Sequence, residues 1–189
     1  MRIAAIAVLC LFVAIPLAPA LPAFSGDTSS WPVPQSPVIP AADGYASIPG
    51  APFRPGHTHV FHAVFDATLA AEKPDRLIPA LNMAGSELNA LGVEKVRLAN
   101  ARFVVVFHGA ALAGILDDAH YRSRFGVPNP NLAVLAQLKK AGVKLYACGQ
   151  NLIAEHIDRA ILSPDVQVAS DALLVLMVFQ NRGYALMSF

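Results

Sequence analysis

Cys148 is the residue of this sequence best placed for covalent chemistry. It follows a run typical of a strand, 143–147 (VKLYA), and precedes a segment typical of a helix. Free N–H groups and the helix dipole at such a junction favour the nucleophilic thiolate. Gly149 leaves the sulfur uncrowded, and the Gln150 amide could donate a hydrogen bond to a bound anion. The competing interpretation is a packed cysteine, because free cysteines are among the most buried residues.

His108 is the second candidate, and it ends another apolar run, 102–107 (RFVVVF). Ligands of open parallel sheets bind beyond the carboxyl ends of the strands, where Asp66 and Thr68 are also expected. An imidazole at this edge could carry a proton for the thiol, although the commoner role of such a histidine is to bond a loop carbonyl. We assign a catalytic role to His108 and Cys148. The expected substrate-binding residues are Gly109, Asn131, Gly149 and Gln150.

Other chemistries lack their residues in the sequence. No G-x-G-x-x-G follows a strand and no G-x-S-x-G elbow is present, so we expect no dinucleotide, no cofactor and no serine hydrolase site. His57, His59 and His62 have spacing that resembles a metal site, but on a strand His62 points away from the other two. We assign no metal ligand, and a metal-binding protein that uses His57 and His59 is a third hypothesis.

Composition excludes several classes of protein. The chain has 189 residues, 55% of them hydrophobic and 14% charged, with a mean hydropathy of +0.49, which excludes an intrinsically disordered protein. A net charge of +1 provides no basic excess for nucleic acid. Two cysteines exclude a disulfide framework and a four-cysteine zinc site.

Residues 1–20 have the layout of a secretory signal peptide. A basic Arg2 precedes the apolar run 3–15, and small residues at 18–20 suit a signal peptidase. We therefore expect a periplasmic or secreted protein that meets the membrane only through this segment; the alternative is an uncleaved anchor. Cleavage would leave Cys148 as the single cysteine.

Residues 21–55 contain eight prolines, which lack the N–H needed for helices and sheets. We expect an extended, solvated arm there, with Trp31 and Tyr45 as residues that could dock on the domain or on a neighbouring subunit.

Residues 56–189 alternate between strand and helix patterns, which predicts an α/β domain. Such alternation implies parallel strands joined by right-handed crossovers, and therefore a three-layer sandwich around a mainly parallel sheet of about five strands. The strands are expected at 59–65, 102–107, 143–147, 166–169 and 184–189, and the helices at 75–91, 111–116, 131–141, 150–161 and 171–182.

Two sequence blocks, 129–132 (NPNL) and 148–152 (CGQNL), together with VVVFHG at 104–109 and GYAL at 183–186, resemble the DsrE/DsrF-like family. The resemblance covers about 57–189 and is greatest to the exported branch of the family, although Asn151 stands where exported relatives commonly carry a smaller residue. It implies a flavodoxin-like fold and homo-oligomers, often trimers or their multiples. Cytoplasmic relatives carry sulfur as a persulfide on a cysteine that matches Cys148.

The leading hypothesis is therefore an exported protein that handles sulfur through Cys148 as a persulfide carrier, resembling a sulfurtransferase if it is an enzyme. Its sulfur donor would be a small inorganic or a protein-bound species. The alternative is a non-enzymatic periplasmic binding or scaffold module in which Cys148 is structural. Tyr121, Phe125 and Val127 are candidates for a subunit contact, because few charged residues cover the apolar chain.

Overall fold

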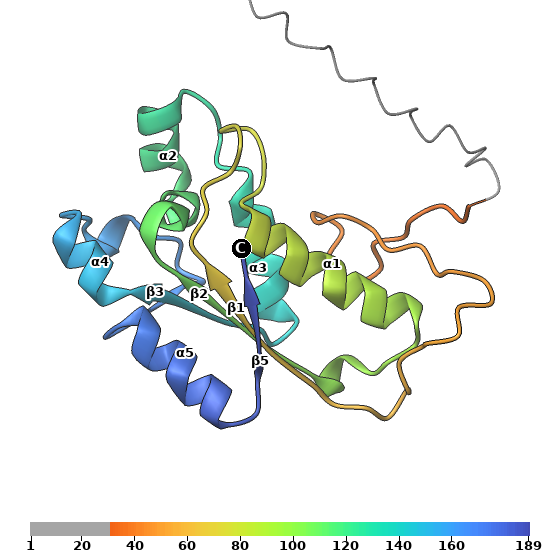
Figure 1. Cartoon of the computed structure of the whole chain (residues 1–189). Helices are drawn as coiled ribbons and strands as arrows, with labels where there is room; N and C mark the ends of the chain where they lie inside the picture. Colours follow the sequence, from red (N-terminus) through yellow and green to blue (C-terminus); the bar gives the residue numbers. More distant parts are fainter. Residues whose placement is uncertain (1–30) are drawn as a thin grey trace, which may run out of the picture. The chain divides into compact units, whose positions relative to one another are not determined.

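The computed structural model describes residues 31–189 (Figure 1). The predicted signal peptide, 1–20, and the first part of the proline-rich arm lie outside the described residues. Among residues 31–189, no helix has the length and apolar character needed to cross a bilayer.

Five parallel strands form one sheet in the order β4-β3-β2-β1-β5. The predicted α/β sandwich with a flavodoxin-like, parallel five-stranded sheet is confirmed. The central strand β2 is apolar on both faces, as its continuous hydrophobic run predicts. The strands are β1 (Phe61–Ala67), β2 (Ala101–Phe107), β3 (Lys144–Cys148), β4 (Gln167–Ala169) and β5 (Ala185–Ser188).

Helices cover both faces of the sheet (Figure 1). α1 and α3 enclose the larger apolar core, and α5 packs on the opposite face over Val64, Val104 and Val106. The helices are α1 (Pro79–Val93), α2 (Asp118–Phe125), α3 (Asn131–Lys140), α4 (Gly149–Ala154) and α5 (Ala172–Asn181), with 3₁₀ turns η1 (Leu98–Asn100), η2 (Gly109–Ile115) and η3 (Arg159–Ile161).

Helix boundaries differ from the sequence prediction where local backbone geometry intervenes. α1 begins only at Pro79, which suits the first helical position because that position needs no N–H donor. The helix expected at 150–161 ends at Ala154, and His156 adopts a left-handed φ of 54° that an α-helix cannot continue through. Gly109, with φ 55°, starts a 3₁₀ turn in place of the expected helix at 111–116.

The described part of the arm, residues 31–55, is docked on α1 (orange in Figure 1). Ile39 is 0% exposed and belongs to the main core. The Asn89 side chain accepts from the N–H groups of Val38 (3.0 Å) and Ile39 (2.8 Å) and donates to the Ile39 carbonyl. The expectation of a solvated arm is therefore wrong for this part. The buried side-chain amide of Asn89 provides hydrogen bonds to the backbone of the arm, which cannot pair as a regular strand because of its prolines.

Candidate functional site

Cys148 lies where β3 ends and two helices begin. Its Sγ accepts a hydrogen bond from the backbone N–H of Ala172, at 3.3 Å, and as a neutral thiol it donates a long one, of 4.0 Å, to Asp171 Oδ2. Asp171 is the N-cap of α5, and its Oδ1 accepts from Leu174 N–H. The sequence predicted an amide donor from the helix that follows Cys148. The donor comes instead from α5, 24 residues further along the chain.

Cys148 is 3% exposed and packs with Val104, Val106 and Leu176 beneath α5. An open groove of about 640 Å³ passes beside it between α4 and β4. The lining of that groove includes Gly149 but not Cys148. Any sulfur donor must therefore be small, or the first turn of α5 must move to admit it.

His108 follows β2 and forms a close pair with Asp66 of β1, with 2.6 Å between Nε2 and Oδ1. Both side chains are about one-fifth exposed. In the sheet register, Phe107 pairs with Ala147, so His108 and Cys148 are the next residues of adjacent strands. Strand alternation places both on the face covered by α5. Asp66 is a member of this group to which the sequence argument gave no role, and the register is the signal that finds it.

The glycines and amides near Cys148 are engaged with the protein itself. Gly109 N–H donates to Asn151 Oδ1 at 3.2 Å, which joins the loop after β2 to α4. Gln150 Nε2 donates to the Ser170 carbonyl at 3.2 Å. A Cβ on Gly149 would lie 2.6 Å from the Ala169 carbonyl oxygen, so this position requires glycine for close packing. Substrate binding by Gly109, Gly149 and Gln150 stays a prediction.

Asn131 belongs to a buried polar network. Its Oδ1 accepts from Ile78 N–H at 2.9 Å, and its Nδ2 donates to Asn129 Oδ1. Asn129 Nδ2 in turn donates to the carbonyls of Leu116 and Gly114. Asn131 is 0% exposed, and these contacts hold the loops before α1 and α3 together. A ligand role for Asn131 stays a prediction.

The histidines before and within β1 contact aromatic rings. His59 lies 4.6 Å from the Phe61 ring, and His62 lies 4.9 Å from the Tyr184 ring, measured between centroids. Within residues 31–189, no group of three or more histidine, cysteine or acidic side chains is arranged to hold a metal ion. The metal hypothesis therefore gains no support from the geometry.

The residues proposed for a subunit contact are partly internal. Tyr121 is 3% exposed and its hydroxyl donates to the Pro74 carbonyl at 2.8 Å, so Tyr121 as a contact residue is wrong. Phe125 and Val127 are half-buried against the main core. The large exposed apolar side chains gather instead on the outer side of α5, at Leu173, Leu174, Met177 and Val178.

The model of the DsrE/DsrF-like family matches residues 63–189, which include most of β1 and the Cys148 junction. The chain belongs to the DsrE/DsrF-like family. No curated protein matches the chain.

Two solved structures are similar to this DsrE/DsrF-like chain. MTH1491 from Methanobacterium thermoautotrophicum, described as a protein of unknown function, is 19% identical with a TM-score of 0.52, covering 68% of this chain and 99% of that one. The ychN protein from E. coli is 16% identical with a TM-score of 0.49, covering 69% and 100%. The likeness to MTH1491 supports the fold alone.

Proposed function

We propose that this DsrE/DsrF-like protein handles sulfur through Cys148. The Sγ thiolate attacks the sulfane sulfur of thiosulfate or a polysulfide, a new S–S bond forms, and sulfite or the shortened polysulfide leaves with the electron pair of the broken S–S bond. The observation that carries this proposal is the Ala172 N–H donated to Sγ at 3.3 Å. A donor aimed at sulfur stabilises the thiolate more than the neutral thiol, because a charged acceptor forms the stronger hydrogen bond.

The His108–Asp66 pair supports the same chemistry. When the Asp66 carboxylate accepts from Nε2–H, the other ring nitrogen, Nδ1, is left to exchange a proton. The pair lies at the sheet edge where Cys148 ends the adjacent strand. In this role His108 accepts the proton of the Cys148 thiol, and Asp66 orients the His108 ring.

Mass spectrometry of the intact protein tests this proposal. After incubation with thiosulfate or polysulfide, we expect a gain of one sulfur atom that maps to Cys148. The chain also contains Cys10, so Cys10→Ser is the matched control and should retain the adduct, whereas Cys148→Ser should lose it. Alkylation of folded protein by iodoacetamide at pH 7 is the second measurement. A Cys148 that reacts no faster than a free thiol contradicts an activated thiolate.

The second candidate function is a binding or scaffold module with a structural cysteine. The 3% exposure of Cys148 among valines favours it. In this case Cys148→Ser keeps every cellular property of the protein while lowering its stability, because a hydroxyl replaces sulfur in an apolar site. A variant that loses its cellular role while remaining folded favours the sulfur carrier.

We also propose that the protein is exported to the periplasm or secreted. Support comes from the sequence alone, in the basic start, the apolar run 3–15 and the small residues at 18–20. The intact mass of protein taken from its native compartment tests this. A mature chain that begins near Leu21 agrees with export, and an intact Met1 in the cytoplasm contradicts it.

We further propose that the protein forms homo-oligomers, trimers or their multiples, with α5 in the contact. One side of α5 packs on the sheet, and the other exposes Leu173, Leu174, Met177 and Val178. A helix that is apolar on all sides is typically buried, so a second copy covering this face explains its composition. Sedimentation of the Leu174→Glu variant tests the contact, and an unchanged oligomeric mass contradicts it.

A further inference from the structure

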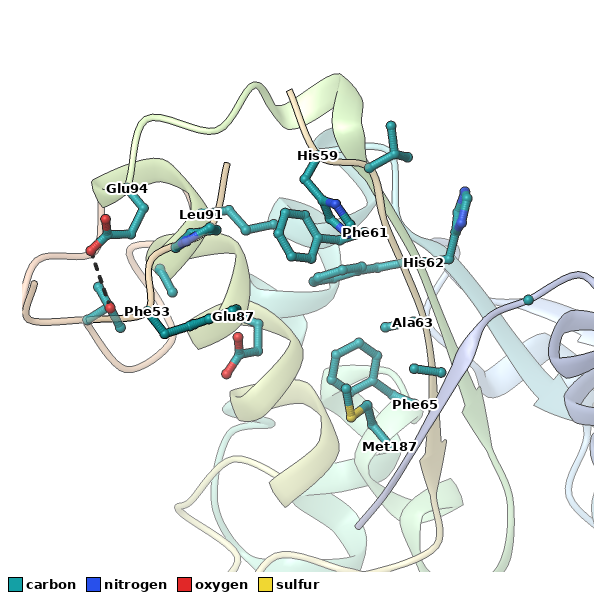
Figure 2. A pocket seen from close by; sticks show the side chains of 17 residues that line it. Phe53, His59, Phe61, His62, Ala63, Phe65, Glu87, Leu91, Glu94 and Met187 are labelled. Atoms are coloured by element: carbon teal, nitrogen blue, oxygen red, sulfur yellow. Dashed lines mark hydrogen bonds between the residues drawn. The ribbon is translucent and has the colours of Figure 1, made fainter. Parts of the chain in front are cut away.

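A second region of the molecule has the properties of a ligand site. It is a pocket of about 520 Å³ between α1, β1 and β5 (Figure 2). We call it the aromatic pocket, and it is defined here by Phe53, Phe61, Phe65, Phe103, Met187 and Glu87. Its volume lies within the range of small-molecule sites, about 300–1,000 Å³. The pocket lies on the sheet face opposite α5, and its lining does not include Cys148, His108 or Asp66.

The pocket exists because the edge of the sheet is incompletely covered. α1 packs over β1 and β2, whereas Ala185 and Met187 of the edge strand β5 extend beyond the helix. Phe65 and Phe103 are fully or nearly buried at its base. Figure 2 shows Phe65 and Met187 on the strand side and Glu87 on the helix side. Phe53, which is 85% exposed, comes from the docked arm and lies at the rim.

Two glutamates that line this pocket, Glu87 of α1 and Glu94 at the C-cap of α1, differ in their partners. Glu94 is engaged, because it accepts from Ser47 Oγ at 2.9 Å and pairs with Arg54 Nε at 3.2 Å. Within residues 31–189, no hydrogen bond or salt bridge reaches the Glu87 carboxylate. Glu87 is exposed to solvent on one side, and the partial loss of water around its carboxyl group raises its pKa. An unpaired carboxylate beside aromatic rings therefore has no cationic partner within the described chain.

We infer that the aromatic pocket binds a small organic cation, an amine carried on an aromatic or aliphatic body. The ammonium group pairs with Glu87, and the apolar body lies against Phe61, Phe65 and Met187. Aromatic faces add to the attraction of a cation, whereas a carboxylate ligand meets repulsion from Glu87. The inference is independent of the sulfur chemistry proposed for Cys148.

Isothermal titration calorimetry with two matched probes tests the inference on the full chain. Tryptamine carries an ammonium group, and tryptophol has the same indole body with a neutral hydroxyl. We expect tryptamine to bind about tenfold more tightly than tryptophol, which corresponds to about 1.4 kcal/mol. Glu87→Gln should bring the two affinities to near parity. The matched control Glu155→Gln, an exposed carboxylate at the end of α4, should keep the tenfold preference.

A second variant examines the apolar half of the site. Phe53→Ala should weaken both probes severalfold without affecting folding, because this ring is 85% exposed. Equal affinity of the two probes for the unmodified protein overturns the inference, as does a preference that survives Glu87→Gln. Absence of binding at millimolar tryptamine also overturns it. Binding that falls as protein concentration rises overturns it too, since this result assigns the pocket to a second copy of the chain.

Discussion

The junction around Cys148 and the aromatic pocket divide two requirements of a functional site between them. The junction holds a nucleophile, an amide donor and a histidine–carboxylate pair, but Cys148 is almost sealed from solvent. The aromatic pocket offers about 520 Å³ of space and an unpaired carboxylate, but its lining includes no cysteine. Residues of chemical interest can be found from sequence motifs, whereas accessible volume arises from incomplete packing at a sheet edge.

The largest effect expected is on sulfur uptake. Cys148→Ser should abolish the sulfur adduct, because a hydroxyl cannot form a persulfide, and should leave tryptamine affinity unchanged. Intact mass and calorimetry on the same preparation measure both. A loss of tryptamine binding in this variant would show that the two regions are coupled.

Release of the arm from α1 should weaken tryptamine binding and leave sulfur uptake unchanged, which is the reverse of the Cys148→Ser result. Asn89→Ala leaves the buried N–H of Ile39 without its acceptor and should lower the free energy of unfolding by about 2 kcal/mol. Urea denaturation measures this loss. Because Tyr45 and Phe53 of the arm line the aromatic pocket, tryptamine binding should weaken, whereas sulfur uptake at Cys148 should persist. Asn82→Ala, which removes an exposed contact to Asp43, is the milder control.

A smaller effect is expected from deleting the amide donor at Cys148. Ala172 is the first residue of α5, where proline is tolerated, and Asp171 before it is extended, which also suits proline. Ala172→Pro should slow alkylation of Cys148 by about tenfold, because a hydrogen bond to a charged group contributes about 1.5–3 kcal/mol. Ala172→Gly keeps the N–H and should react like the unmodified protein. Equal rates for the two variants would remove the amide from the mechanism.

The smallest effect expected concerns acid sensitivity of the arm. The hydroxyl of Ser47 donates to Glu94 and, together with Arg54, lowers the pKa of that carboxyl. A lowered pKa means that this contact stabilises the fold above the pKa of the unfolded chain, and that its contribution is lost as pH falls through the folded-state pKa. Proteolysis within residues 31–55 should therefore accelerate on acidification. Glu94→Gln should flatten this pH dependence, and an unaltered profile would assign the acid sensitivity to another group.

Much of the sheet could be predicted from local patterns. The apolar run of β2 and the ends of the strands at Phe107 and Cys148 can be predicted from residues adjacent in sequence. The edge location of Cys148 follows from these alone. Its amide partner could not be found in this way, because Ala172 is distant in sequence and reaches Sγ only through the packing of α5.

Docking of the arm could not be predicted either, because its contacts also join residues that are distant in sequence. Proline content correctly excludes helices and long strands in residues 31–55, but it does not show that Asn89 satisfies their backbone groups. The aromatic pocket is also a tertiary result, since it depends on α1 leaving β5 uncovered. Family membership and fold could be predicted from sequence motifs, whereas the choice between an exposed and a packed Cys148 could not.

The close packing of Gly149 against the end of β4 affects how related sequences are interpreted. Because a Cβ at this position would lie 2.6 Å from the Ala169 carbonyl oxygen, Gly149 cannot be replaced by a larger residue without a shift of the backbone, whatever the neighbouring thiol does. A chain that had lost all reactivity would still preserve a glycine there to keep its outermost strand attached. A Cys-Gly pair in a related sequence would therefore indicate the packing of this strand against its neighbour, and a reactive thiol would have to be shown by its access to solvent.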